Sequence, residues 1–184
     1  MRVIAGSLKG RRLRTPTWPG LRPTSDKLRE TLFDILAPRV AGARVLDGYA
    51  GTGALGIEAI SRGAAWVSFV EHDPRAAALI AENLAHCRIA NGYVIIRADV
   101  ARALKVLSER PGFEPFHIVL LDPPYIVEPV EHLLRTLNLA ALVLAPTGIM
   151  VLEHARRHRS PATAGRLSRS REVHSGDSTL AFFE

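Results

Sequence analysis

Five short apolar runs alternate with longer stretches of helical periodicity between residues 44 and 152. The run 117–121 is apolar nearly throughout, which is typical of a strand buried on both faces in a parallel sheet that helices cover. The pattern therefore predicts a doubly wound, Rossmann-like α/β domain. The predicted strands are 44–47, 66–70, 93–97, 117–121 and 148–152, and the predicted helices are 54–61, 74–86, 99–109 and 127–140.

The N-terminal part of the chain precedes this alternation. Residues 2–5 and 11–14 flank a turn-prone segment and are expected to form a short basic β-hairpin. A helix capped by Thr24 or Ser25 is expected to run to about Leu36, with Pro38 just past its end. We therefore divide the chain into a basic extension, residues 1–23, and one larger domain, residues 24–184.

The C-terminal part is expected to complete the sheet. An amphipathic run at 166–173 and an apolar run at 179–183 are close enough in sequence to pair as an antiparallel hairpin at the sheet edge.

Positive charge is concentrated at the two ends of the chain. The net charge is +6, but residues 1–44 carry ten Lys and Arg against three Asp and Glu, residues 45–155 carry eight against twelve, and residues 156–184 carry six against three. Segregated charge favours a polyanionic partner more strongly than a uniform basic bias does. The run 9–14 fits phosphate binding, although charges that protect an exposed hairpin edge from aggregation would give the same pattern.

Cysteine and apolar content indicate the compartment. A single cysteine, Cys87, excludes an internal disulfide, the apolar run 3–6 is too short for a signal peptide, and no uncharged apolar stretch is long enough to span a bilayer. We expect a cytoplasmic protein.

A glycine-rich loop follows the first predicted strand directly. The spacing Gly51-x-Gly53-x-x-Gly56 matches the nucleotide-binding fingerprint in the required strand-to-helix context. Glycines at this position let the backbone approach a ligand at the N-terminus of a helix. A loop that serves packing alone is the alternative interpretation.

Carboxylates follow the next two predicted strands. Glu71 ends the second strand, where a carboxylate can bind both ribose hydroxyls of an adenosine. Asp99 follows the third predicted strand. Its carboxylate can accept a hydrogen bond from an adenine amino group, and it can also cap the following helix; the two roles are compatible. An NAD enzyme and an S-adenosylmethionine enzyme both fit these positions. Asp47 favours the second, because it would repel a pyrophosphate and attract the ammonium group of S-adenosylmethionine.

The fourth predicted strand ends in Asp122-Pro123-Pro124-Tyr125. Two prolines remove two backbone donors and leave carbonyl acceptors, an arrangement that suits an amine. The Asp122 carboxylate and a proline carbonyl could accept the two hydrogens of an exocyclic base amine, and Tyr125 could stack on the base. The alternative is a proline turn in which Asp122 caps and Tyr125 packs.

Two other chemistries find no support in the sequence. Methylation at a pyrimidine C5 needs a cysteine nucleophile, but Cys87 falls in a predicted helix away from the strand ends. The histidines are scattered singly, so no metal site is expected.

Three sets of residues resemble the ordered motifs of class I amino-methyltransferases: Leu46-Asp47-x-Tyr49-Ala50-Gly51-Thr52-Gly53, Val70-Glu71 and Leu121-Asp122-Pro123-Pro124-Tyr125. More narrowly, the bacterial RsmD family, which methylates a guanine N2 in small-subunit ribosomal RNA, is similar over residues 1 to about 154. The segments that carry this resemblance are Arg2-Val3-Ile4-Ala5-Gly6 with Lys9-Gly10-Arg11, Arg22-Pro23-Thr24 with Arg29-Glu30-Thr31-Leu32-Phe33, and Gly53-Ala54-Leu55-Gly56-Ile57-Glu58-Ala59.

The resemblance implies a seven-stranded sheet with its last strand antiparallel, S-adenosylmethionine as methyl donor, and an N-terminal hairpin that contacts 16S ribosomal RNA or the small-subunit particle. It also implies that Thr24 approaches the methionine end of the cofactor. Two departures are evident: Gly48 stands where the family usually has an apolar residue, which would loosen the loop, and Ser175-Gly176-Asp177-Ser178-Thr179 replaces a Tyr-Gly-Asp-Thr pattern.

These observations together predict a guanine-N2 methyltransferase of 16S ribosomal RNA, with an adenine-N6 methyltransferase of DNA or RNA as the alternative. We expect a monomer without a membrane or an obligate protein partner. The expected catalytic residues are Asp122, Pro123, Pro124 and Tyr125; the expected cofactor-binding residues are Asp47, Tyr49, Gly51, Gly53, Glu71, Asp99 and Thr24; and the expected RNA-binding residues are Lys9, Arg11, Arg12, Arg14 and Arg22.

Overall fold

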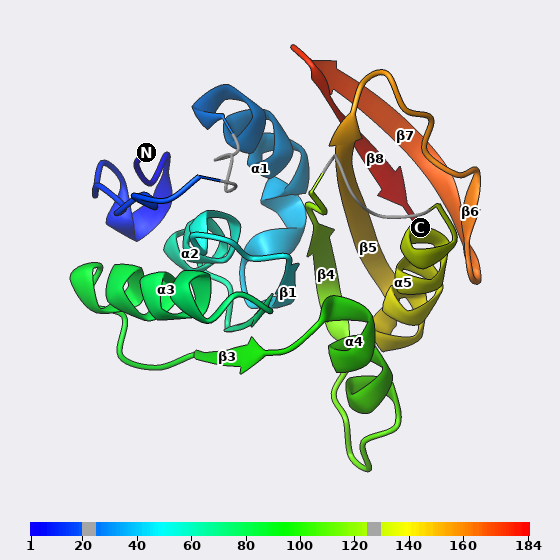
Figure 1. The fold of residues 1–184 in the computed structure, drawn as a ribbon, viewed down its shortest axis with the longest axis horizontal. Helices are drawn as coiled ribbons and strands as arrows, with labels where there is room; N and C mark the ends of the chain where they lie inside the picture. The colour runs from blue at the N-terminus through cyan, green and yellow to red at the C-terminus, as the bar shows by residue number, and fades with distance from the viewer. Residues whose placement is uncertain (20–24, 125–129) are drawn as a thin grey trace.

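A single mixed sheet runs through the computed structural model, which describes residues 1–19, 25–124 and 130–184 (Figure 1). Its strand order is β3-β2-β1-β4-β5-β8-β7-β6, in which β1 to β5 are parallel and the last three are antiparallel. The strands are β1 (Arg44–Gly48), β2 (Trp66–Glu71), β3 (Tyr93–Arg97), β4 (Phe116–Leu121), β5 (Leu144–Ala155), β6 (Thr163–Ala164), β7 (Leu167–Ser175) and β8 (Ser178–Phe183).

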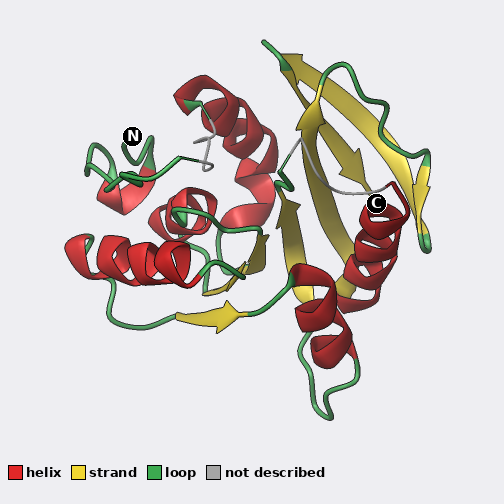
Figure 2. Ribbon diagram, viewed as in Figure 1, coloured by secondary structure: helices red, strands yellow, loops and turns green. Residues whose placement is uncertain are grey.

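Helices cover both faces of the sheet (Figure 2). One core cluster contains buried side chains of α1, α2 and α3, and the other contains those of α4 and α5. Strand residues alternate between the two clusters: Val45 faces one and Leu46 the other. This confirms the doubly wound prediction. The helices are α1 (Asp26–Val40), α2 (Ala54–Ser61), α3 (Pro74–His86), α4 (Val100–Ser108) and α5 (Val130–Val143), with a short 3-10 helix η1 (Gly6–Leu8).

The strand count differs from the seven that the resemblance implied. The additional strand is β6, a two-residue pairing of Thr163 and Ala164 with Leu167 and Ser168 at the outer edge. A strand this short leaves no periodicity in the sequence. The expected C-terminal hairpin is confirmed: β8 inserts antiparallel beside β5, and β7 pairs with β8.

Helix α1 extends further than the sequence predicted. Ser25 caps it, since its Oγ accepts from the N–H of Leu28 at 3.2 Å, but the helix continues through Pro38 to Val40. Leu32, Leu36 and Val40 lie four residues apart and are all buried. Burying this additional apolar side chain offsets the backbone hydrogen bond that Pro38 cannot make.

The N-terminal segment folds back on itself without forming regular strands. Arg2 and Arg12 form an antiparallel bridge, and Gly10 donates to the carbonyl of Val3 at 2.9 Å. Val3 and Leu13 also donate across it, to the carbonyls of Arg11 and Met1 at 2.9 and 3.1 Å, so the expected hairpin forms, but as one bridge and not as strands over 2–5 and 11–14. Beyond this pairing, the backbone donors of Ile4 and Ala5 are directed elsewhere. They bond the carboxylate oxygens of Glu58 on α2, at 2.7 and 3.0 Å.

This docking makes the segment part of one core. Val3 and Leu13 are buried in the same cluster as α1 and α2, and Glu58 is fully buried while its Oε1 also accepts from Arg62. Gly6 approaches α2 so closely that a Cβ there would lie 1.9 Å from the carbonyl oxygen of Ser61. Among the described residues, no helix is both long and apolar enough to cross a membrane.

Candidate active site

The chain order reverses at the carboxyl ends of β1 and β4. From β1 the chain moves outward to β2 and β3, then crosses back to β4 on the other side. Ligands of open α/β sheets bind at such a reversal point. Gly48 pairs with Val70 on one side and Leu121 on the other, so the residues that follow these three strands meet at one edge of the sheet.

The loop between β1 and α2 has an unusual backbone. Gly51 and Gly53 have φ values of 55° and 77°, and Tyr49 has a φ of 62°, a left-handed conformation that side chains disfavour. Gly53 is the N-cap of α2, so the loop leads into the N-terminus of that helix. The predicted turn therefore forms, and the strain at Tyr49 is of the kind that collects at ligand sites.

Two glycines that flank the loop are closely packed. Gly48 ends β1, and a Cβ there would lie 2.7 Å from Leu121 Cδ2; Gly56 is in the first turn of α2, and a Cβ there would lie 2.2 Å from Phe69 Cε1. The missing side chain of Gly48 leaves room for Leu121 of β4, and the expectation that Gly48 loosens the loop stays a prediction.

Asp47 lies beneath the loop and is 1% exposed. Its Oδ2 accepts from the N–H of Gly56 at 2.8 Å, which links the end of β1 to the first turn of α2. Burial, partly offset by this hydrogen bond and reinforced by the nearby charge of Glu71, raises the pKa of Asp47 to about 8. The side chain is therefore mostly protonated at neutral pH in the absence of a cation.

Glu71 joins the end of β2 to the glycine loop. Its Oε2 accepts from Gly51 N at 2.9 Å, and its Oε1 accepts from Asp73 N at 2.8 Å. The side chain is buried, and Oε1 also lies 3.1 Å from His72 Nδ1, so Oε2 has the acceptor site that remains for a ligand hydroxyl. The carboxylate is held rigidly at the position where the sequence predicted ribose binding.

Two further residues, Asp99 and Thr24, were also predicted to bind the cofactor. Asp99 is exposed and caps α4, accepting from Arg102 N at 2.9 Å, so its capping role is confirmed and its role toward adenine stays a prediction. Thr24 lies outside the described residues.

The tetrapeptide follows β4 as predicted. Asp122 donates its N–H to the Gly48 carbonyl at 3.4 Å, which places it beside the start of the glycine loop. Pro123 is buried and Pro124 is exposed, whereas Tyr125 lies outside the described residues. The structure thus brings Asp47, Glu71 and Asp122 to one edge of the sheet.

The basic residues of the N-terminal segment divide into two groups. Lys9 and Arg12 are exposed, and no hydrogen bond or ion pair of their side chains occurs within the described part of the chain. Arg11 instead donates from Nη1 to the Cys87 carbonyl at 2.8 Å, and Arg14 pairs with Glu82 at 2.7 Å. Arg22 lies outside the described residues.

Sequence reasoning missed Asn83, a buried residue of α3. Its amide joins the N-terminal segment to the glycine loop: Oδ1 accepts from Arg14 N at 2.7 Å, and Nδ2 donates to the carbonyls of Arg14 and Thr52 at 3.2 and 3.0 Å. The available signal was a polar residue within the apolar stripe of α3, beside Ile80 and Leu84. Asn83 therefore positions both the basic segment and the loop.

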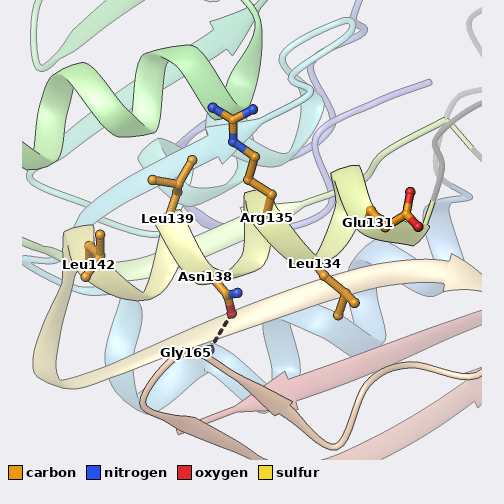
Figure 3. A pocket seen from close by; sticks show the side chains of 7 residues that line it. All are labelled: Glu131, Leu134, Arg135, Asn138, Leu139, Leu142 and Gly165. Carbon is orange, nitrogen blue, oxygen red and sulfur yellow. Dashed lines mark hydrogen bonds between the residues drawn. The ribbon is translucent and has the colours of Figure 1, made fainter.

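A depression of ≈ 710 Å³ lies elsewhere, between α5 and the turn before β7 (Figure 3). Asn138 Oδ1 accepts from Gly165 N at 2.7 Å, the dashed line in Figure 3, and so joins α5 to this turn. None of the predicted site residues lines it; its lining residues are Glu131, Leu134, Arg135, Asn138, Leu139, Leu142 and Gly165.

The parallel strand order, with β8 antiparallel between β5 and β7, together with the glycine loop and acidic strand ends, defines the class of S-adenosylmethionine-dependent methyltransferases. The structure of yhhF from Escherichia coli superposes with a TM-score of 0.82 at 34% identity, covering 100% of this chain and 96% of that one.

Sequence comparisons narrow the class to a family. Residues 1–184 match the family described as Conserved hypothetical protein 95. YlbH of Bacillus subtilis is 37% identical over 184 residues, which cover 100% of this chain and 98% of that protein. Ribosomal RNA small subunit methyltransferase D of Escherichia coli K12 is 42% identical over 125 residues, 68% of this chain and 60% of that protein. The chain belongs to this family, the RsmD family, as its motifs indicated.

Proposed function

We propose that this protein transfers the methyl group of S-adenosylmethionine to the exocyclic N2 of a guanine in 16S ribosomal RNA. One observation supports this most directly: Asp122-Pro123-Pro124 follows β4 at the point where the sheet order reverses, beside the glycine loop. The name of the E. coli relative, a ribosomal RNA small subunit methyltransferase, supports the choice of substrate.

The residues present fit an adenosine-containing cofactor. Glu71 offers an oriented carboxylate oxygen for a ribose hydroxyl, and Gly51 and Gly53 let the backbone of the loop approach closely. When bound, S-adenosylmethionine supplies a methyl group on a positively charged sulfur. Asp47 and Glu71 favour a cationic ligand over a pyrophosphate at this edge.

The strand end after β4 positions the base amine. The Asp122 carboxylate and a proline carbonyl accept its two hydrogens, which turns the nitrogen lone pair away from the ring and toward the methyl donor. When the N–CH₃ bond forms and the S–CH₃ bond breaks, the amine loses one proton, and Asp122 is placed to take it. Tyr125 stacks on the base in this proposal.

In this proposal the N-terminal segment binds the RNA substrate. Lys9 and Arg12 bind phosphates directly, while Arg11 and Arg14 hold the segment against α3. We place the reaction in the cytoplasm, where ribosomal RNA and small-subunit particles are found, and expect a monomer that contacts no membrane.

The Asp122→Ala variant tests this function. Wild type and variant are incubated with labelled methyl donor and with either naked small-subunit ribosomal RNA or assembled particles that lack this modification. The variant is expected to bind S-adenosylhomocysteine within about threefold of wild type but to lose methyl transfer by a factor of about 100 or more, because the amine is no longer oriented.

Nucleoside mass analysis of the product identifies the methylated atom. N2-methylguanosine is expected, whereas N6-methyladenosine would select the adenine alternative. The control is Asp34→Ala, an exposed carboxylate on α1 that makes only a 3.7 Å pair with Arg62. Full transfer activity in Asp122→Ala would contradict the mechanism.

A further inference from the structure

The segment Arg156-Arg157-His158-Arg159 forms a second basic surface, which we name the C-terminal basic loop. It begins directly after β5, and all four of its side chains are exposed. Arg157 Nε contacts His158 Nε2 at 3.3 Å, and in the described ranges none of the three arginines pairs with a carboxylate. The loop therefore presents three positive charges to solvent.

The loop is fixed to the sheet at both ends. At its start, Arg156 N donates to the Asp177 carbonyl in the β7–β8 turn at 2.7 Å. At its end, Ser160 is buried, donates to Glu172 Oε1 at 2.5 Å, and accepts from Arg169 Nη1 on its carbonyl and hydroxyl oxygens. The backbone carbonyl of Asp177 and the carboxylate of Glu172 therefore hold the two ends of the loop in place.

The C-terminal basic loop lies near the edge of the sheet that carries Asp47, Glu71 and Asp122, which we name the catalytic edge. Leu121 of β4 pairs with Leu152 of the adjacent parallel β5, so Asp122 lies opposite Glu153. Arg156 follows three residues later, about 10 Å further along the strand direction. Figure 1 shows this loop leaving β5 on one side of the β4 end, while the N-terminal segment lies on the other side, beyond α1 and α2.

We propose that the C-terminal basic loop binds phosphates of the RNA substrate on the β5 side of the catalytic edge. Arginine guanidinium groups match phosphate oxygens in geometry and charge, and like charges this close together repel one another until a polyanion neutralises them. The N-terminal segment and this loop then hold the RNA strand from two sides of the target base. The inference rests on the proposed function for the identity of the RNA.

The double variant Arg156→Gln/Arg159→Gln tests this surface. Its matched control is Lys105→Gln/Arg110→Gln, which also removes two positive charges from exposed side chains. The control residues lie on α4 and in the turn after it, and α4 leads away from the catalytic edge toward the start of β4. Binding of a small-subunit ribosomal RNA transcript is measured at several salt concentrations.

The loop variant is expected to bind the transcript at least about fivefold more weakly at low salt. The slope of log affinity against log salt is expected to fall by about 1.4, or about 0.7 for each phosphate that the variant no longer neutralises. Its KM for RNA should rise while kcat stays within about twofold, because the loop does not touch the reacting atoms. Affinity for S-adenosylhomocysteine should not change. The control should match wild type in all of these quantities.

Two failures are distinguishable. Equal affinity and salt slope in the loop variant, the control and wild type would overturn the proposed surface, whatever the enzyme methylates. A wild-type protein that binds the transcript but methylates neither naked RNA nor particles would contradict the proposed function, and the difference in salt slope would still decide whether the loop binds RNA.

Discussion

The two basic regions of this molecule use their charges differently. In the N-terminal segment, Arg11 and Arg14 bond α3 and Arg2 lies 3.6 Å from Asp26, so only part of the charge is available to a ligand. In the C-terminal basic loop, backbone groups and Ser160 provide the anchoring, and the arginines remain exposed. The comparison shows that arginine-rich sequence can serve docking in one place and stay exposed to solvent in another.

The difference follows from what lies beneath each region. The N-terminal segment packs on α2 and α3, whose carboxylates and carbonyls meet its donors. The C-terminal basic loop extends beyond the end of β5 and is held mainly by the β7–β8 hairpin among the described residues. Three predictions run from the largest expected effect to the smallest; the first and the last test this contrast, and the second tests the acidic edge of the sheet between the two regions.

Gly6→Ala should undock the N-terminal segment. The added methyl group would lie 1.9 Å from the Ser61 carbonyl oxygen, and the residue also has a φ of 80°. We expect the free energy of unfolding to fall by about 3 kcal/mol or more, since both strain and a steric clash contribute. Urea denaturation measures this change.

Gly10→Ala is the matched control for that substitution. Gly10 has a φ of 83° but nothing lies within 4 Å of its added Cβ, so only the backbone strain of about 1 kcal/mol applies. Equal losses in the two variants would mean that the segment is not docked on α2.

A second test concerns Asp47, a buried acidic residue that lies outside both basic regions. Because its folded pKa is raised from 3.8 to about 8, the folded protein holds a proton that the unfolded chain has released between these values, and stability falls as pH rises through that window. A cationic ligand group favours the ionised carboxylate. Affinity for S-adenosylhomocysteine should therefore rise between pH 6 and pH 8, by up to about tenfold per pH unit.

Calorimetry in buffers of different ionisation enthalpy would detect the proton released on binding. Asp47→Asn serves as the control, because an amide does not titrate and its oxygen can still accept from Gly56. A flat affinity profile in wild type, or an equally steep one in Asp47→Asn, would show that Asp47 does not couple to the ligand.

The smallest effects separate two neighbouring arginines. Arg12→Gln should reduce the salt slope of RNA binding by about 0.7 to 0.9 and leave stability unchanged, because its side chain is exposed. Arg11→Gln should instead cost about 1 kcal/mol of stability, because the hydrogen bond to the Cys87 carbonyl is removed. The reverse pattern would contradict the assignment of docking and binding roles within the segment.

Much of the architecture could be predicted because it is encoded locally. The bounds of α2 and α3 agree with the predicted 54–61 and 74–86, since glycine and proline mark the start of each helix and apolar periodicity marks its length. Differences occurred where distant groups take part: Glu58 binds the backbone donors of Ile4 and Ala5, so the N-terminal hairpin has a single bridge, and the buried Val40 carries α1 past Pro38.

The sequence by itself determined the doubly wound sheet, the glycine loop and the acidic strand ends, because strand and helix periods and the order of elements bring those ends to one edge. Only the tertiary structure decided that Asn83 links the basic segment to the loop, that Gly48 packs closely against Leu121, and which arginines remain exposed. These contacts join residues far apart in the chain. Their partners are chosen by how helices pack on the sheet, which leaves no periodic signal in the sequence.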